Sequence, residues 1–532
     1  MNNILVINLT RLGDIIQSIG LLRGLKKKYP NCKIDFLAMS SFAGILSNID
    51  GIDEIISLDD KSLVDNIHSD FWGGYEELQT KIDYLNSKNY DLLVNPIMSL
   101  QSSYLSTLID AKEKRGMIIT ADGEQSVKSD WSSFLLSNQH NLGDHSFNLV
   151  NIFAGIAGTS FDIADYHIKT DKKIDVNLGD GKYRIGFHVG ASQSNKTWPI
   201  EYFKEVISVL VKNTEYELFL FGGYKETDVK DYFNDIKQDN FHNWIGKFKL
   251  DELISAIFLM DLFVTNDTGP MHIAACVKVP IINLSLGPVS MWETGAYSEK
   301  VIALQADIDC HPCSFSYICP HWNCHYMIIP AAVIGLIEKK FNPNTKDLYF
   351  KNVLYWKSIV DLFGYIHWVP LTKRQIREKE LLFELKRCIW AITLNNTFHN
   401  QEIIVKEYMQ FINNHYDRGD YNYEQIKQAS QILLAYCQQI IMYLREIVIL
   451  SRNIKNNLDK IKSIWSNVIS LKNTMFIQAK EHSVIYDWFL HLSFTESQLE
   501  IEDLGELTKE TISLYEKLSK QLKLLTELID YY

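Results

Sequence analysis

The chain has 532 residues, 46% of them hydrophobic, so two or three domains with sizeable cores are expected. Its formal net charge of -12 argues against nucleic acid as the main partner. The sequence contains no run of 18 apolar residues, so no transmembrane segment is predicted. The first residues lack the basic and apolar regions of a secretory signal. We therefore expect a cytoplasmic protein.

Residues 1–345 alternate between strand and helix patterns. In chain order these are the strand Ile4–Leu9, helix Ile15–Lys28, strands Lys33–Ala38, Tyr90–Asn95 and Tyr183–Val189, helix Ile200–Val211, strand Tyr216–Phe221, helix Leu250–Leu259, and strands Leu262–Val264 and Val279–Leu284. The pattern restarts near residues 170–182. This α/β alternation predicts two doubly wound, Rossmann-like domains that face a cleft, with ligands bound beyond the carboxyl ends of the strands.

Beyond about residue 345 the composition changes. No proline follows Pro370, and only three of the 26 glycines lie in this part. Apolar residues recur at helical spacing, namely Ile426, Leu433, Cys437, Ile440, Leu444 and Ile447, and then Ile454, Leu458, Ile461, Trp465 and Val468. We interpret these stripes as core in preference to a groove for a partner. The expected domains are residues 1–175, 176–345 and an all-helical 346–532.

The most informative segment is Asn266–His272. It lies between an apolar strand end and the helix-compatible run Ile273–Val277. Unpaired backbone N–H groups at the start of a helix attract phosphate, Gly269 permits close approach of a ligand, and Pro270 suits a first helical turn. The segment predicts a diphosphate- or nucleotide-binding corner, although helix capping alone would also explain its Asp and Gly.

Three further polar side chains follow predicted strands. Asp14 is either a general base at the cleft or a carboxylate that complements a helix dipole. Lys196, in the loop before a helix, either binds phosphate or is solvated. Glu226 either accepts hydrogen bonds from a sugar hydroxyl or begins a helix.

Together these motifs resemble a known family. In order they are Leu12-Gly13-Asp14, then Gly190-Ala191-Ser192 with Lys196-Thr197-Trp198-Pro199, then Gly222-Gly223 with Glu226, then Asp267-Thr268-Gly269-Pro270 with His272. Tyr90–Val94 and Lys114–Gly116 also look like landmarks of it. Over about residues 1–340, the chain resembles the family 9 glycosyltransferases, the ADP-heptose heptosyltransferases of bacterial lipopolysaccharide core synthesis.

The resemblance implies a GT-B fold and inverting sugar transfer from a nucleotide sugar such as ADP-heptose, with no required metal or cofactor. Asp14 matches the base, and Lys196 matches the lysine that contacts the donor phosphates. The remaining matches are donor-site positions, namely Gly13, Ser192, Glu226, Phe248, Asp267, Thr268, Gly269 and His272.

The acceptor half departs from the family. Ile55–Lys61 has two carboxylates and one lysine where an Arg/Lys-rich segment is usual, and Pro96–Ser102 lacks the usual arginine. Since unpaired carboxylates repel an anionic sugar, we expect an acceptor other than the usual Kdo-lipid A. The acceptor could be a glycan, a glycolipid or a protein hydroxyl, and the sequence does not decide among them.

The role of the helical region is equally open. It would recognise the acceptor protein in a protein O-glycosyltransferase, drive oligomerisation, or brace the other domains. A different class of function, a non-catalytic protein that binds nucleotide sugars or glycans, also fits the fold. Peripheral attachment at the inner membrane is an alternative to a freely cytoplasmic location.

Four cysteines cluster at C-x2-C-x5-C-x4-C spacing, namely Cys310, Cys313, Cys319 and Cys324. In a cytosolic chain such a cluster predicts a metal before a disulfide. Zinc sites usually separate two ligand pairs by a longer loop, and this cluster is compact. A structural metal and reduced, redox-sensitive thiols are therefore both kept as interpretations.

Overall fold

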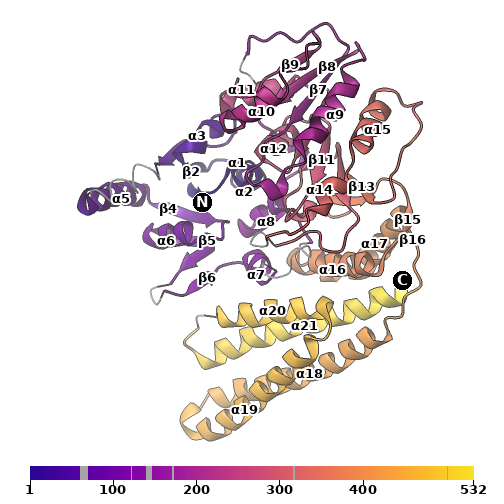
Figure 1. The fold of residues 1–532 in the computed structure, drawn as a ribbon. Coiled ribbons are helices and arrows are strands. Elements are labelled where there is room, and N and C mark those ends of the chain that lie inside the picture. Colours follow the sequence, from indigo (N-terminus) through magenta and orange to yellow (C-terminus); the bar gives the residue numbers. More distant parts are fainter. Residues whose placement is uncertain (60–69, 121–122, 139–145, 171–172, 315–317, 500) are drawn as a thin grey trace. The chain divides into compact units, whose positions relative to one another are not determined.

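The computed structural model describes residues 1–532 except 60–69, 121–122, 139–145, 171–172, 315–317 and 500 (Figure 1). The chain forms two compact units. The first comprises residues 1–129 and 147–372, and the second comprises residues 130–146 and 373–532. Asp60 and Lys61 of the acidic stretch lie outside the described residues.

The first unit begins with a six-stranded sheet in the order β3-β2-β1-β4-β5-β6, parallel except for β6. Its strands are β1 Asn3–Asn8, β2 Lys33–Met39, β3 Glu54–Leu58, β4 Tyr90–Asn95, β5 Ala111–Ile119 and β6 Gln125–Val127. Its helices are α1 Leu12–Gln17, α2 Ile19–Lys28, α3 Ser40–Leu46, α5 Phe71–Ser87, α6 Leu100–Leu108 and α8 Leu149–Ile156. The central strands are continuous apolar runs because helices cover a parallel sheet on both faces.

The second sheet of this unit has eight strands in the order β14-β13-β12-β11-β10-β7-β8-β9. The strands are β7 Tyr183–His188, β8 Tyr216–Phe221, β9 Phe241–Asn243, β10 Leu262–Asn266, β11 Ile281–Ser285, β12 Val301–Ala306, β13 Val353–Val360 and β14 Ile366–Pro370. The helices are α9 Ile200–Leu210, α10 Thr227–Tyr232, α11 Leu250–Phe258, α12 Gly269–Cys276, α13 Met291–Thr294, α14 Asn323–Met327 and α15 Pro330–Phe341. Two Rossmann-like sheets in one unit confirm the predicted GT-B class.

The helical region starts later than the expected boundary at residue 346. Strands β13 and β14 pair antiparallel at the edge of the second sheet, beside β12. The strand pattern of β13 and β14 is short and directly precedes the helical segments. For that reason, composition alone assigned both strands to the helical domain and not to the second sheet.

The single helix expected over residues 15–28 is interrupted at Ser18, between α1 and α2. The Nδ2 of Asn8, the last residue of β1, donates to the Asp14 carbonyl oxygen and to the Ser18 hydroxyl, both at 3.0 Å. The buried Asn8 amide therefore fixes the short helix α1 to the carboxyl end of the first sheet. This local arrangement positions Asp14.

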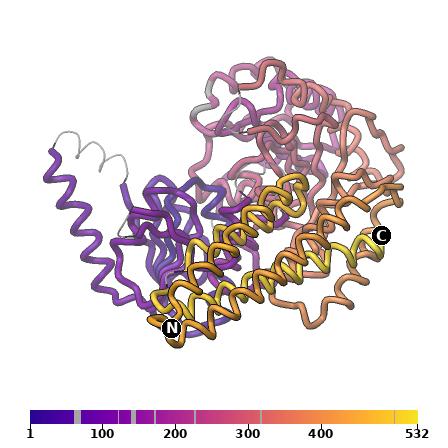
Figure 2. The backbone as a smooth tube through the Cα atoms, turned by 90° about the horizontal axis from the view of Figure 1, so that it is seen from below, coloured from indigo at the N-terminus to yellow at the C-terminus, as the bar shows by residue number. Residues whose placement is uncertain are grey.

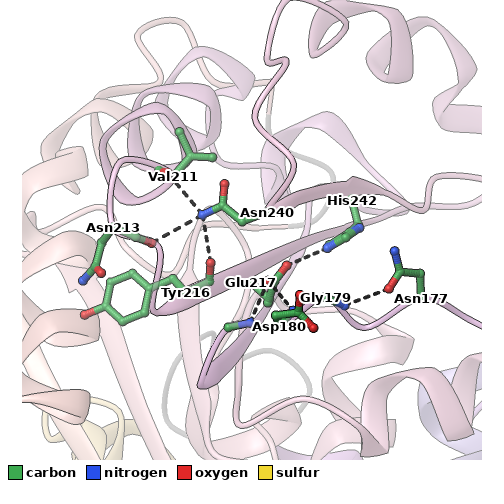
Figure 3. Close-up of polar contacts among 10 residues, drawn as sticks. Asn177, Gly179, Asp180, Val211, Asn213, Tyr216, Glu217, Asn240 and His242 are labelled. Carbon is green, nitrogen blue, oxygen red and sulfur yellow. Dashed lines mark hydrogen bonds and ion pairs between the residues drawn. The ribbon is translucent and has the colours of Figure 1, made fainter.

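The segment that joins the two sheets is anchored by a buried carboxylate. Glu217 Oε1 accepts from the backbone N–H groups of Asp180 and Gly181 at 3.0 and 2.8 Å, and its Oε2 lies 2.7 Å from His242 Nε2 (Figure 3). Gly179 has a φ of +69°, and a Cβ there would lie 2.1 Å from the Glu217 carboxyl carbon. The close approach requires glycine.

Replacing Glu217 with alanine is expected to leave two backbone N–H groups and one imidazole without their buried acceptor. The expected loss is about 2–3 kcal/mol of unfolding free energy. Urea denaturation, followed by the fluorescence of the tryptophans, measures it. The exposed neighbour Glu215→Ala is the control and should change stability by less than about 0.5 kcal/mol; equal effects of the two variants would contradict this assignment.

The second unit is helical apart from the two-residue strands β15 Arg374–Gln375 and β16 Tyr416–Asp417. Its helices are α7 Asp130–Ser137, α16 Glu378–Leu394, α17 Gln401–His415, α18 Glu424–Ser451, α19 Ile454–Ala479, α20 Ser483–Ser497 and α21 Leu504–Tyr531. The long helices α18 to α21, orange to yellow in Figure 2, lie side by side. The predicted helical domain is thereby confirmed.

Helix α7 belongs to this unit although it comes from the middle of the N-terminal half. Phe134 packs edge-on against Trp390 with ring centroids 5.0 Å apart, and Lys517 Nζ lies 2.8 Å from Asp130 Oδ2. The Arg387 guanidinium donates to the Ser146 carbonyl oxygen. The chain thus crosses between the units three times, so the helical unit is not a simple C-terminal appendage.

Candidate active site

A cleft of about 500 Å³ lies within the first unit. Both sheets contribute to it: α1 and the segment before it from the first, and the loops after β7, β8 and β10 from the second. The ten predicted catalytic and donor-site residues all line it, namely Gly13, Asp14, Ser192, Lys196, Glu226, Phe248, Asp267, Thr268, Gly269 and His272. The cleft lies where the carboxyl ends of parallel strands bind ligands.

Asp14 occupies the first turn of α1. Its Oδ2 accepts from the Arg11 N–H at 3.4 Å, so the carboxylate does complement the helix start while it lines the cleft. Burial raises the pKa of Asp14, and the hydrogen bond from Thr10 and the charges of Arg11 and Lys196 oppose that rise. A carboxylate with a raised pKa is a better proton acceptor than an ordinary aspartate.

Asn266, at the end of β10, holds together the loops of the second sheet. Its Oδ1 accepts from the Trp198 N–H at 3.0 Å, and its Nδ2 donates to the carbonyl oxygens of Val189 and Gly190 at 3.4 and 3.3 Å. This side chain is fully buried. It is part of the sequence motif but was not predicted as a site residue, because an Asn before Asp-Thr-Gly is normally explained by a turn.

The Asp267 carboxylate is buried at the same turn. Burial raises its pKa to about 6, and the charge of Lys196 and a hydrogen bond from Thr294 oppose the rise. Thr294 Oγ1 lies 3.2 Å from Asp267 Oδ2 and also lines the cleft. Thr294, on α13, was not predicted, since nothing in its sequence neighbourhood distinguishes it.

Gly13 and Gly269 allow the two halves of the cleft to meet. A Cβ on Gly13 would lie 3.0 Å from His272 Cδ2, and one on Gly269 would lie 2.6 Å from Leu12 Cδ2. Burial lowers the pKa of His272 to about 4, so this imidazole is neutral at pH 7. His272 therefore contributes a packing surface and a neutral hydrogen-bonding group beside Lys196.

Lys196 lies in a 3-10 turn, Ser194–Lys196, and is buried. The carbonyl oxygens on either side of it are bridged by His325, whose Nδ1 lies 2.9 Å from the Thr197 oxygen and whose Nε2 lies 3.1 Å from the Asn195 oxygen. His325 was not predicted as a site residue; in sequence it directly follows Cys324. Its contacts make it a positioning residue for the Lys196 turn.

Gly287 supports the same turn from the other side. Its φ is +60°, and a Cβ would lie 2.1 Å from the Asn195 carbonyl oxygen. Gly287→Ala is therefore expected to displace the Lys196 turn, with about 1–2 kcal/mol of backbone strain. If the cleft binds ADP, as the sequence resemblance implies, the affinity should fall at least about tenfold. Titration calorimetry with ADP measures the effect.

Gly364 provides the matched control for that substitution. It also has a positive φ, +78°, but a Cβ there would meet nothing within 4 Å. Gly364→Ala should carry the same backbone strain and leave ADP affinity unchanged. If both variants bound ADP as the wild type does, the Lys196 turn would not depend on Gly287.

Glu226 lies against two glycines of the cleft. A Cβ on Gly190 would lie 3.0 Å from Glu226 Oε1, and one on Gly223 would lie 3.1 Å from its Oε2. Glu226 also ends the 3-10 turn before α10, which confirms the interpretation as a helix start; its contact with a sugar hydroxyl stays a prediction. Its carboxylate lines the cleft.

An aromatic wall closes the other end of the cleft. Phe248 packs edge-on against Trp244 with ring centroids 5.1 Å apart, and Phe221 lies 6.4 Å from Phe248. All three rings line the cleft. Such a surface suits a flat heterocyclic base.

The four cysteines do not form a metal centre in the part of the chain that the structure describes. There, no group of three or more His, Cys, Asp or Glu side chains could hold a metal ion. All four are free thiols, and burial raises the pKa of Cys313 and of Cys324. The spacing predicted ligands, but no such group is found among the described residues, and the interpretation as reduced thiols stays a prediction.

Comparison with known proteins agrees with this geometry. Residues 82–321 match the model of "Glycosyltransferase family 9 (heptosyltransferase)". The chain is 28% identical over 309 residues to lipopolysaccharide heptosyltransferase 1 of Campylobacter coli, covering 53% of this chain and 83% of that protein. It is 32% identical over 174 residues to lipooligosaccharide heptosyltransferase 2 of Campylobacter jejuni, covering 31% of this chain and 54% of that protein.

Among solved structures, a family 9 glycosyl transferase from Veillonella parvula is similar at 22% identity and a TM-score of 0.49. The similarity covers 64% of this chain and 96% of that one.

Proposed function

We propose that this chain, whose residues 82–321 form a glycosyltransferase family 9 domain, transfers a heptose from ADP-heptose to an acceptor hydroxyl with inversion. One observation carries the proposal. A single cleft holds a half-buried carboxylate, Asp14, from the first half and a buried cation, Lys196, from the second. Those are the two charges that a one-step displacement of a diphosphate requires.

In the proposed reaction the acceptor hydroxyl attacks the anomeric carbon. Asp14 accepts the hydroxyl proton while the bond from carbon to the diphosphate oxygen breaks. Lys196 and the backbone N–H groups at the start of α12 stabilise the negative charge on the departing diphosphate. One in-line displacement inverts the anomeric centre, so one base suffices.

The two ends of the cleft support a nucleotide sugar as the donor. Phe248 and Trp244 supply an apolar wall for the base, and Glu226 supplies an acceptor for sugar or ribose hydroxyl groups. The assignment of heptose follows the similarity to the heptosyltransferase family, since aromatic packing does not select one sugar.

The acceptor is proposed to carry less negative charge than Kdo-lipid A. Glu54 Oε2, on β3, lies 2.6 Å from Nζ of Lys88, which follows α5, so this cation is already paired. Segment Pro96–Ser102 supplies the N-cap of α6 through Ser99, whose hydroxyl accepts from the Ser102 N–H, and offers no cation. An uncharged glycan or a protein hydroxyl suits such a surface.

A transfer assay tests the proposal. Purified full-length protein is incubated with ADP-heptose, ADP-glucose, a UDP-sugar or a GDP-sugar, and release of the nucleoside diphosphate is followed with Kdo-lipid A or a neutral glycan as acceptor. ADP-heptose should be the preferred donor, the product should have the inverted anomeric configuration by NMR, and a chelator should not reduce the rate. Preference for another donor would remove the heptosyl assignment; efficient transfer to Kdo-lipid A would overturn the acceptor assignment.

A further inference from the structure

Helices α18 and α19 of the second unit expose an unusual amount of apolar surface. By length and composition α18 is apolar enough to cross a membrane, yet only 33% of its most apolar window is buried. Large exposed side chains continue from one helix to the next, namely Ile432, Met442, Ile449, Ile454, Leu458, Ile469, Phe476 and Ile477. The sequence stripe that included Ile454 and Leu458 was expected to be core, and for these two residues that expectation is wrong.

Three of the exposed apolar residues of α19 share one face. Leu458, Ile469 and Phe476 are eleven and seven residues apart, about three and two helical turns, so they project from the same side. The adjoining side is buried against the rest of the unit through Ile461, Ile464, Val468 and Met475. A helix with a packed side and a separate apolar outer side has surface available for a partner.

Lysines share this outer face. Lys462 follows Leu458 by four residues and Lys480 follows Phe476 by four, so each lies on the same side one turn further along. Lys455 precedes Lys462 by seven residues. All three are exposed, and none has an ion pair among the residues that the structure describes.

The charge of this segment is opposite to that of the chain. Residues 452–480 carry Arg452 and five lysines against one carboxylate, Asp459, whereas the whole chain has a net charge of -12. Two of those lysines are neutralised: Lys460 lies 2.7 Å from Glu446, and Lys472 lies 2.5 Å from Glu496. The remaining cations lie among the exposed apolar side chains.

We propose that the α18–α19 hairpin docks onto an anionic lipid surface. Apolar side chains interleaved with lysines on a helix lying flat fit the boundary between acyl chains and phosphate headgroups. A second copy fits less well, because a symmetric dimer through this face would oppose the same lysines. The hairpin would hold the protein at a membrane independently of the cleft in the first unit.

Vesicle flotation of the full-length protein tests the proposal. Vesicles of phosphatidylcholine alone are compared with vesicles that also contain phosphatidylglycerol, at low and high salt. The double variants are Lys455→Glu with Lys462→Glu, and Ile469→Gln with Ile477→Gln. The control is Ile403→Gln with Lys406→Glu on α17, which alters an exposed apolar residue and an exposed lysine of the same unit.

The wild type and the control should bind the anionic vesicles in a salt-sensitive manner, and each hairpin variant should bind at least about tenfold more weakly. ADP affinity should be the same in all four proteins, which separates this result from any failure of the proposed reaction. The proposal is overturned if the hairpin variants float like the wild type, or if phosphatidylcholine alone binds equally well. Concentration-dependent self-association that only the hairpin variants abolish, without vesicle binding, would instead assign the face to a second copy.

Discussion

Asp14→Asn is expected to lower kcat for sugar transfer by about 10²–10⁴-fold, the usual contribution of a positioned general base. Asparagine keeps the size of the side chain and can still contact the Arg11 backbone, so α1 should not move. It cannot accept the hydroxyl proton. ADP affinity should stay within about twofold, since the carboxylate faces the acceptor hydroxyl in the proposed reaction. Steady-state kinetics and calorimetry on the same preparation measure the two effects.

The pH profile gives a second signature of Asp14. Because burial raises its pKa, kcat/KM of the wild type should fall as the pH is lowered through a value above that of an ordinary aspartate. The residual activity of Asp14→Asn should lack this step. Gln17→Asn, an exchange of one amide for a shorter one in the same helix and cleft, is the control and should retain the wild-type profile.

The raised pKa of Asp14 also determines whether its ionised carboxylate stabilises or destabilises the folded protein. A carboxylate whose folded-state pKa is raised binds its proton more tightly in the folded protein, so its contribution to stability falls as the pH rises through that range. At neutral pH the ionised Asp14 is therefore destabilising. Asp14→Asn should unfold at the same or a higher temperature than the wild type. An inactive variant that is also much less stable would indicate a structural role instead.

Lys196→Ala is expected to lower kcat by about 10²–10³-fold, the typical cost of removing one group that stabilises transition-state charge. It should also weaken ADP binding, because Lys196 faces both the bound and the departing diphosphate in the proposed reaction. Lys212→Ala, an exposed lysine just after α9, is the matched control and should leave both quantities unchanged. Rapid-quench measurement of the chemical step separates the two effects.

Removing Lys196 should also change the buried carboxylates beside it. Its positive charge opposes the rise in the pKa of Asp267, which is about 6 with the lysine present. Without the lysine that pKa should rise further. NMR titration of Asp267 in the two proteins measures the shift, and no shift would mean that Lys196 lies too far away to act on this corner.

The donor half of the cleft could be predicted because its chemistry lies in short segments at strand ends. β10 and α12 flank Asp267 much as periodicity predicted, and a buried parallel strand is a continuous apolar run that is easy to recognise. Groups that act from a distance were missed. Thr294 lines the cleft from α13, whereas His325, on α14, contacts the turn that carries Lys196, and only the folded chain brings them near Asp267 and Lys196.

The helical unit was harder to predict for a different reason. A helical stripe reports which residues lie on one side of a helix but not whether that side is covered, and so Ile454 and Leu458 were assigned to the core. Helix α7, residues 130–137, joins this unit through Trp390, a contact between residues far apart in sequence. Deleting everything after residue 350 would remove β13 and β14 and uncover Phe134, so variants of the full chain are the better probes.

The central claim is that the cleft binds the phosphates of a nucleoside diphosphate through Lys196 and its base through the aromatic wall. Calorimetric titration of ADP and of adenosine into the wild type and into Lys196→Ala tests this claim most directly. The wild type should prefer ADP to adenosine, and the variant should lose at least about tenfold in ADP affinity, about 1.4 kcal/mol, while adenosine binds both proteins equally. Equal losses for both ligands, or no loss for ADP, would contradict the claim.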